Sequence, residues 1–199
     1  MVRCAITNGM HAELDDTKAS CIDLAGRCAR NGIEFVQLRE KHLEASALLE
    51  LAEAMQRALR AEPAMTKLLI NGRPDVAVAA GADGVHLSSR CGELTPAQVR
   101  AIFVSSGRPL PFVSVSCHHP DEAGRAAAQG ADLILFGPVF EKRVGDELVG
   151  QGLGLGALAA ACSLAAPVRV LALGGVTAET WLACHRAGAQ GFAGIRAFL

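Results

Sequence analysis

The chain has 199 residues, of which 51% are hydrophobic and 20% charged, and its formal net charge is -1. This composition is ordinary for one globular domain, so we expect a single soluble domain over residues 1–199. The near-zero charge gives no field that attracts nucleic acid or an anionic membrane, and no apolar run of 18 residues occurs. We therefore expect neither nucleic acid nor a membrane as a partner.

Short apolar or β-branched runs alternate along the chain with alanine- and leucine-rich stretches of helical character. The predicted strands are residues 2–7, 33–39, 67–70, 84–87, 112–116, 133–136, 169–173 and 191–195. The predicted helices are residues 17–31, 44–60, 73–80, 95–104, 119–129, 155–165 and 177–187. This alternation is typical of βα units around a parallel sheet. Eight units favour a closed (β/α)₈ TIM barrel, with an open doubly wound sheet as the alternative.

The helix ends carry a repeat. The phrase Gly-Ala-Asp or Gly-Ala-Gln occurs at residues 81–83, 130–132 and 188–190, which predicts three equivalent helix-to-strand turns. Only Ala197, Phe198 and Leu199 remain for an eighth helix, so that helix should be short or missing. We expect an exposed apolar flank there, which the partner subunit of a homodimer can cover. A groove closed by the chain's own side chains would contradict this expectation.

The seven cysteines contain no C-x-x-C pair. An odd number without such a pair argues for free thiols in a reducing cytoplasm, rather than for a disulfide framework or a zinc site. We expect small core residues, with only Cys91 and Cys117 near a candidate site. The opening segment, MVRCAIT, lacks the charged and apolar parts of a signal peptide, so we expect a cytoplasmic protein.

The carboxyl ends of the strands carry the functional groups in (β/α)₈ barrels, so the residues there are the site candidates. They are Gln37, Arg39 and Lys41 at the second strand, Asn71 at the third, His86 at the fourth, and Ser116 and His118 at the fifth. In an extended strand Gln37, Arg39 and Lys41 share one face. Buried cations need anionic partners, so this face predicts an anionic ligand at the barrel mouth. The alternative is a solvated edge strand.

Glycines follow the last two predicted strands. Gly174 and Gly175 come after the seventh strand, and Gly194, Ile195 and Arg196 lie at the end of the eighth. In this fold these two loops commonly bind phosphate through backbone N–H groups, because glycine lets an anion approach closely. The alternative is that the glycines only form tight turns. With Arg196, the two pairs favour a small phosphorylated substrate.

The loop at residues 141–156 contains five glycines, charges of both signs and no apolar period. This composition predicts a mobile segment that can fold over the mouth as a lid. Lys142 and Arg143 would then meet an anion. The alternative is a surface loop with no functional role.

Six motifs in chain order carry a resemblance. They are VQLREK (36–41), LLINGRPDVAVAAGADGVHL (68–87), VSVSCHHPDEA (113–123), ADLILFGPVFEK (131–142), LALGGV (171–176) and GAQGFAGI (188–195). This combination resembles the thiamine phosphate synthase and thiazole tautomerase family. The resemblance implies a (β/α)₈ barrel. In the synthase branch it implies coupling of 4-amino-5-hydroxymethyl-2-methylpyrimidine diphosphate to a thiazole phosphate, with release of pyrophosphate, in thiamine biosynthesis.

The resemblance also implies roles for individual residues. The pyrimidine diphosphate would be held by Gln37, Arg39, Lys41 and Asn71, and the thiazole phosphate by Gly152, Gly174, Gly175, Gly194, Ile195 and Arg196. Ser116 would lie beside the leaving pyrophosphate, and Lys142 would be the lysine of the lid. His86 and His118 are further substrate-binding candidates. Arg39, Lys41, Ser116 and Lys142 are the catalytic candidates.

Two departures concern the metal. The resemblance implies Mg²⁺ held by two carboxylates, and Gly72 and Cys91 stand at their positions. Magnesium prefers carboxylate and phosphate oxygens, so the metal ligands are unknown, with Asp75 and Glu93 as candidate substitutes.

A third departure concerns the branch. Asn-Gly-Arg at residues 71–73 resembles the tautomerase branch, but Pro138 replaces the histidine that this branch uses as its acid/base group. A cationic diphosphate cradle has no use in a tautomerase, so the synthase is favoured. The alternatives are a tautomerase that uses His118, and a non-catalytic binder of thiamine phosphate.

Overall fold

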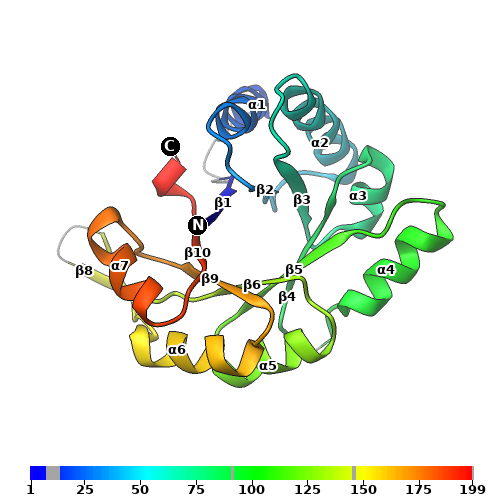
Figure 1. Cartoon of the computed structure of the whole chain (residues 1–199). Helices are drawn as coiled ribbons and strands as arrows, with labels where there is room; N and C mark the ends of the chain where they lie inside the picture. The colour runs from blue at the N-terminus through cyan, green and yellow to red at the C-terminus, as the bar shows by residue number, and fades with distance from the viewer. Residues whose placement is uncertain (8–13, 91, 145–146, 199) are drawn as a thin grey trace.

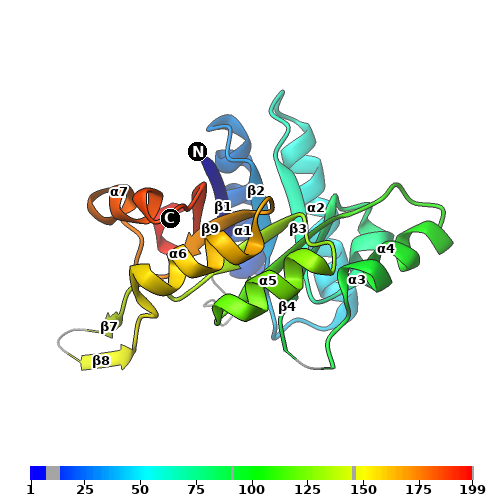
Figure 2. The same ribbon diagram turned by 60° about the horizontal axis from the view of Figure 1, so that its bottom comes forward.

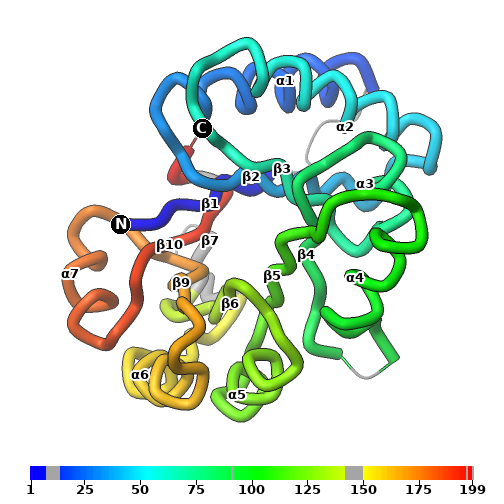
Figure 3. The backbone as a smooth tube through the Cα atoms, turned by 45° about the vertical axis from the view of Figure 1, so that its right-hand side comes forward, coloured from blue at the N-terminus to red at the C-terminus, as the bar shows by residue number. Residues whose placement is uncertain are grey.

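The computed structural model describes residues 1–7, 14–90, 92–144 and 147–198. Eight parallel strands of this part of the chain close a barrel in the order β1-β10-β9-β6-β5-β4-β3-β2, and helices surround it (Figures 1 and 3). The barrel strands are β1 (Val2–Ile6), β2 (Phe35–Leu38), β3 (Lys67–Asn71), β4 (Gly84–Ser88), β5 (Phe112–Cys117), β6 (Leu133–Phe136), β9 (Arg169–Leu173) and β10 (Gly191–Gly194). This closed barrel confirms the predicted fold class.

The outer ring of helices follows the predicted order. The helices are α1 (Leu14–Arg30), α2 (Ala45–Arg60), α3 (Pro74–Ala80), α4 (Pro96–Ser105), α5 (Pro120–Ala128), α6 (Gly154–Ala165) and α7 (Ala178–Arg186). The predicted ends differ from these bounds by three residues or fewer. None of the helices in the described ranges has the length and apolarity that a membrane crossing needs.

Two apolar cores hold the barrel. The outer core lies between strands and helices, and α2 contributes Leu48, Leu51, Met55 and Leu59, which share one helix face because they recur every three or four residues. The inner core fills the barrel with Cys4, Ile6, Phe35, Leu69, Leu133, Leu135, Leu171 and Ala193. Five of the six described cysteines are buried and all six are free thiols, as the sequence predicts.

The three repeated turns are equivalent, as predicted. Asp83 Oδ2 accepts from the Leu68 N–H at 2.8 Å, Asp132 Oδ2 from the Val113 N–H at 2.7 Å, and Gln190 Oε1 from the Val170 N–H at 2.8 Å. In each case the residue just before one strand accepts, through its side chain, from the backbone N–H of the second residue of the preceding strand. These bonds lie at the amino-terminal end of the barrel, the end that serves stability in this fold.

A single turn of 3₁₀ helix, η1 (Arg196–Phe198), replaces the eighth helix. It lies between α7 and α1 (Figure 1), and the Phe198 ring stacks on Phe192 with centroids 5.6 Å apart. Trp181 contacts the same Phe192 ring at 6.0 Å. Phe198 therefore packs on part of the predicted apolar flank, and the side chains of Trp181, Phe192 and Phe198 all stay partly exposed.

The loop predicted to be a mobile lid contains a hairpin. Strands β7 (Lys142–Val144) and β8 (Glu147–Gly150) pair antiparallel, with Arg143 opposite Leu148 and Val144 opposite Glu147. Figure 2 shows the hairpin projecting outward from the barrel body rather than covering it. The predicted strands do not include β7 and β8, which are only three and four residues long.

Candidate active site

The inside of the barrel has one polar wall. Asn71 on β3, His86 on β4 and Ser114 on β5 are neighbours in the strand register, so their side chains form one row across three strands. Gln37 on β2 and Ser116 on β5 extend this polar wall. The remaining strands line the interior with apolar side chains, which include Ile6, Leu135, Leu171, Leu173, Ala193 and Ile195. The candidates Gln37, Asn71, His86 and Ser116 are therefore brought together, as expected.

Gln37 is the most enclosed polar side chain of the second strand. It is 2% exposed, and its Nε2 donates to Asn71 Oδ1 at 3.0 Å. Its Oε1 has no hydrogen-bond partner in the described residues. A buried acceptor without a donor is unfavourable by about 1–3 kcal/mol. The geometry therefore suits a ligand that brings an N–H or O–H group to this oxygen.

Two cations stand at the carboxyl end of β2. Arg39 is half-buried, and its backbone N–H donates to Thr7 Oγ1 at 2.9 Å. The positive charge of its side chain is close enough to His86 to lower the pKa of that ring. Lys41 is exposed in a turn beyond the strand, so the prediction that it shares the strand face of Arg39 is wrong, because β2 ends at Leu38. Within the described ranges, neither Arg39 nor Lys41 takes part in an ion pair. Both charges remain available to an anion.

His86 lies below the mouth, between two serines. It is 4% exposed; Nδ1 is 2.8 Å from Ser114 Oγ and Nε2 is 2.5 Å from Ser116 Oγ. Burial, and after it the charge of Arg39, lowers the pKa of His86 from 6.5 to about 3. The ring is therefore neutral at physiological pH, and both nitrogens already have partners. Sequence reasoning missed Ser114, since a serine inside an apolar strand gives no signal.

A second polar cluster stands at the end of β5. The exposed His118 makes a short hydrogen bond through its ring Nδ1 to the Gly137 carbonyl. The backbone N–H of His118 donates to Glu122 Oε2 at 2.7 Å. The Ser89 hydroxyl donates to the same oxygen at 2.7 Å. Burial acts to raise the pKa of Glu122, but the hydrogen bonds from His118, Ser89 and His119 outweigh it and hold this pKa below its usual value. Glu122 is therefore an anion that anchors the loop carrying His118.

Close packing leaves no room for a side chain at the two glycines after β9. Gly174 has φ +90° and Gly175 has φ +69°, values that side chains rarely adopt. A Cβ on Gly174 would lie 2.7 Å from Pro138 Cβ, and one on Gly175 would lie 2.7 Å from Phe140 Cβ. The loop after β6 therefore presses on this turn. The N–H groups of both glycines make no hydrogen bond to another described residue, so a phosphate can still use them.

The remaining candidates differ in how far they are described. Gly152 packs on the backbone of residues 139–141, where a Cβ would lie 2.6 Å from the Val139 oxygen. Gly194 and Ile195 end β10 at the same rim, partly buried. Cys91 lies outside the described residues, and the backbone but not the side chains of Lys142, Arg143 and Arg196 is described.

The residues of the mouth do not fit a protein-held Mg²⁺. Gly72 has no side chain and its Cβ direction is open, while the candidate substitute Asp75 already binds Arg73 with Oδ2 to Nη2 at 2.6 Å. That pairing lowers the pKa of Asp75, mainly through the hydrogen bonds from Arg73. In the described part of the chain no group of three histidines, cysteines or carboxylates comes together. Carboxylate ligands for the metal are therefore lacking there.

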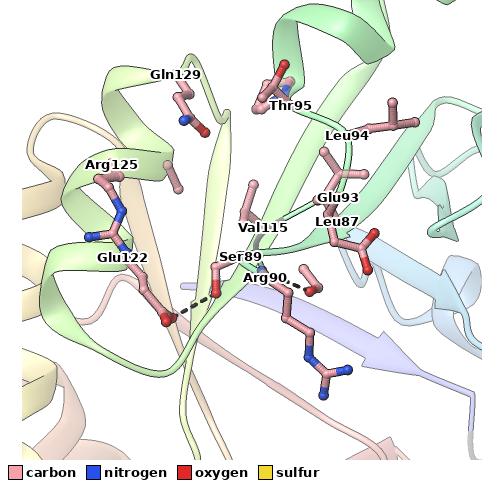
Figure 4. Close-up of a pocket in the computed structure, with 14 residues that line it drawn as sticks. Leu87, Ser89, Arg90, Glu93, Leu94, Thr95, Val115, Glu122, Arg125 and Gln129 are labelled. Atoms are coloured by element: carbon pink, nitrogen blue, oxygen red, sulfur yellow. Dashed lines mark hydrogen bonds between the residues drawn. The ribbon is translucent and has the colours of Figure 1, made fainter.

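A cavity of about 330 Å³ lies between α4 and α5 (Figure 4). Leu87 and Val115 form its floor, and these side chains point to the outside of the barrel. Its rim carries Arg90, Glu93 and Arg125. Since His86 and Ser116 of the same strands point to the inside, this cavity is separate from the polar wall. The candidate substitute Glu93 belongs to the cavity rather than to the mouth.

Comparisons with known proteins place the chain in a family. The family model described as thiamine monophosphate synthase matches residues 5–198. A relative from Geobacter sulfurreducens is 44% identical over 168 residues, 84% of this chain and 74% of the relative. A thiamine-phosphate synthase from Salinibacter ruber is 34% identical over 194 residues, 96% of this chain and 78% of that protein.

A solved structure shares the fold. Thiamine phosphate pyrophosphorylase from Pyrococcus furiosus matches with a TM-score of 0.77 and 22% identity, over 98% of this chain and 86% of that one. At this identity the match supports the barrel alone, while the sequence comparisons above extend to the family. The chain belongs to the thiamine monophosphate synthase family.

Proposed function

We propose that the protein is a thiamine phosphate synthase, which joins 4-amino-5-hydroxymethyl-2-methylpyrimidine diphosphate to a thiazole phosphate and releases pyrophosphate. One observation carries the choice of this reaction. Arg39 and Lys41 stand at the carboxyl end of β2 without a carboxylate partner in the described residues, directly beside the polar wall. Unpaired cations at an enclosed mouth suit a diphosphate, which offers several negative oxygens.

Binding of the pyrimidine follows from the polar wall. The unpaired Oε1 of Gln37 can accept a hydrogen bond from the amino group of the aminopyrimidine. The bond from Gln37 Nε2 to Asn71 Oδ1 fixes the direction of that oxygen. This arrangement distinguishes an aminopyrimidine from a pyrimidine that has an acceptor at the same position, because two facing acceptors repel.

The reaction breaks one bond and forms another. The C–O bond between the pyrimidine methylene and the diphosphate breaks, and its electron pair leaves with pyrophosphate. The lone pair of the thiazole nitrogen then forms the new C–N bond. Charge grows on the departing oxygen, so Arg39, Lys41 and Ser116 stabilise the transition state if they contact that diphosphate. The apolar side of the barrel, with Leu135 and Leu173, keeps water away from the carbocation that forms at the pyrimidine methylene.

The thiazole phosphate is assigned to the rim on the other side of the mouth. The backbone N–H groups of Gly174 and Gly175, which bond to no other described residue, support this assignment, as does the adjacent end of β10 at Gly194. Arg196 and Lys142 remain candidates through their places in the sequence alone. Because no cluster of carboxylates for Mg²⁺ comes together among the described residues, no step is assigned to a metal.

The location in the cell is part of the same proposal. Six described cysteines are free thiols, five of them buried, which is the state expected in a reducing cytoplasm.

The test is a steady-state assay with both substrates, with and without Mg²⁺. We expect thiamine phosphate and pyrophosphate in equal amounts. Turnover of a thiazole carboxylate phosphate alone would instead favour a tautomerase, in which His118 is the exposed acid/base group at the mouth. Tight binding of thiamine phosphate without turnover in either assay would favour a non-catalytic binder.

A further inference from the structure

The three residues Ser114, His86 and Ser116 form a hydrogen-bonded row that ends at the mouth. Ser114 is 0% exposed, His86 is 4% exposed, and Ser116 is partly exposed. The His86 ring bridges the two hydroxyls, with Nδ1 at 2.8 Å from Ser114 Oγ and Nε2 at 2.5 Å from Ser116 Oγ. Only one end of the row can therefore reach a ligand, and that end is Ser116.

The buried end decides which ring nitrogen carries the proton. A neutral imidazole has one N–H and one acceptor nitrogen. The Ser114 hydroxyl has one hydrogen-bond partner in the described residues, which is His86 Nδ1. If Nδ1 carried the proton, the Ser114 hydroxyl would have to accept, and its own proton would be buried without an acceptor. The opposite arrangement pairs both buried protons: the Ser114 hydroxyl donates to Nδ1, and the ring N–H at Nε2 donates to Ser116 Oγ.

The size of this preference follows from the cost of an unpaired buried donor. That cost corresponds to a population ratio of at least about fivefold in favour of the Nε2–H tautomer. Protonation of both nitrogens does not compete at neutral pH, since burial and Arg39 lower the pKa of His86 to about 3. The row therefore has one direction of donation, from Ser114 through His86 to Ser116.

We propose that Ser114 and His86 are positioning residues that hold the Ser116 hydroxyl as a donor toward the mouth. Nε2–H donates to Ser116 Oγ, which leaves the Ser116 proton free for an acceptor outside the row. The ligand class that this end takes is an anionic oxygen, and in the proposed function it is an oxygen of the departing diphosphate. In the opposite tautomer, the Ser116 hydroxyl would donate its proton to Nε2. Only its oxygen lone pairs would then face the mouth, and these repel a diphosphate. The inference rests on the proposed function for the identity of that oxygen.

The first test does not depend on the reaction. Nitrogen-15 NMR of the histidine side chains, in the protein without substrates, reports the protonation of each ring nitrogen, and a His86→Gln variant assigns the signal. We expect a neutral His86 with the proton on Nε2 from pH 5 to pH 8. A proton on Nδ1, or a charged ring in this range, would overturn the proposal whether or not the protein makes thiamine phosphate.

The second test reads the effect on the reaction. Ser114→Ala should lower kcat about tenfold with little change in KM, the loss expected for one hydrogen bond that acts in the transition state. In a Ser116→Ala background, the same Ser114→Ala change should have no further effect on kcat, because the row then ends at His86. Ser114→Thr, which keeps the hydroxyl, should restore most of the rate.

The control is Cys117→Ala on the same strand. Cys117 is 0% exposed and packs in the outer core, so this variant truncates a small buried side chain of β5 without touching the row. It should keep the wild-type kcat. Equal losses from Ser114→Ala in the wild-type and Ser116→Ala backgrounds would show a merely structural role for Ser114 and would refute the positioning role.

Discussion

Gln37 and Asn71 join strands β2 and β3 at the barrel mouth, where Gln37 Nε2 donates to Asn71 Oδ1 at 3.0 Å and leaves Gln37 Oε1 without a partner in the described residues. An enclosed acceptor of this kind makes the empty site slightly unfavourable and a donor-bearing ligand more favourable. The unpaired oxygen lowers the stability of the empty protein, and a loss of stability of this kind is common at functional sites.

Gln37→Leu tests this relation. The change removes the unpaired acceptor, so the free energy of unfolding should stay within about 1 kcal/mol of the wild-type value. The ligand loses its acceptor, so kcat/KM for the pyrimidine diphosphate should fall by about 10- to 100-fold. Urea unfolding and steady-state kinetics measure the two quantities. An unchanged kcat/KM would mean that the Gln37 oxygen does not meet the substrate.

Arg39→Ala tests the diphosphate site. The guanidinium is half-buried and takes part in no ion pair among described residues, so its loss should spare the fold. A charge-assisted hydrogen bond is worth about 1.5–3 kcal/mol, so kcat/KM for the pyrimidine diphosphate should fall by at least tenfold. Arg27→Ala is the matched control, since Arg27 pairs with Asp23 on the exposed side of α1. An Arg39→Ala protein that unfolds would instead assign this arginine to the core.

His86 predicts a loss of stability in mild acid. Its pKa is about 3 when folded and about 6.5 when unfolded, so the unfolded chain binds the extra proton between these values. Stability should be fully present above about pH 6.5 and should fall, as pH drops toward 3, by up to about 1.4 kcal/mol per pH unit. Urea unfolding at pH 7, 6 and 5 measures this slope. His86→Gln cannot titrate and should have a shallower slope; equal slopes would contradict a buried neutral His86.

A comparison of Gly72→Ala with Gly175→Ala separates the cost of backbone strain from the cost of a steric clash. Gly72 and Gly175 have nearly the same φ, +66° and +69°. A Cβ on Gly72 meets no atom within 4 Å, whereas one on Gly175 lies 2.7 Å from Phe140 Cβ. Gly72→Ala should therefore cost about 1 kcal/mol from the left-handed backbone alone, and Gly175→Ala about 1–3 kcal/mol more. Urea unfolding measures both, and equal losses would rule out close packing of the loop after β6 on this turn.

The sequence predicts the barrel well because its signals are local. The strands are short β-branched runs, and the turns at Asp83, Asp132 and Gln190 repeat one phrase with one hydrogen-bond pattern. The carboxyl ends of parallel strands meet at one rim, so the strand assignment alone brings Gln37, Asn71 and Ser116 to one side of it. The residue types at the carboxyl ends of the strands therefore follow from the sequence alone.

The features that sequence reasoning missed depend on contacts between distant residues. Phe198 packs on the expected flank because Phe192 lies under it, and Ser114 matters because His86 faces it from the neighbouring strand. Arg73 and Asp75 are two residues apart, yet their ion pair depends on how the chain turns into α3. The predicted strands omit β7 and β8 for a different reason, because runs of three and four residues are too short to show the alternation of a strand.

The most direct test of the account is a crystal structure of the protein with thiamine phosphate and pyrophosphate. We expect pyrophosphate in contact with Arg39, Lys41 and Ser116, and the phosphate of the product at the glycine turns of residues 174 and 194, on the same rim. Pyrophosphate in the cavity between α4 and α5, beside Arg90 and Arg125, or the two molecules on separate surfaces, would contradict a single mouth that holds both substrates.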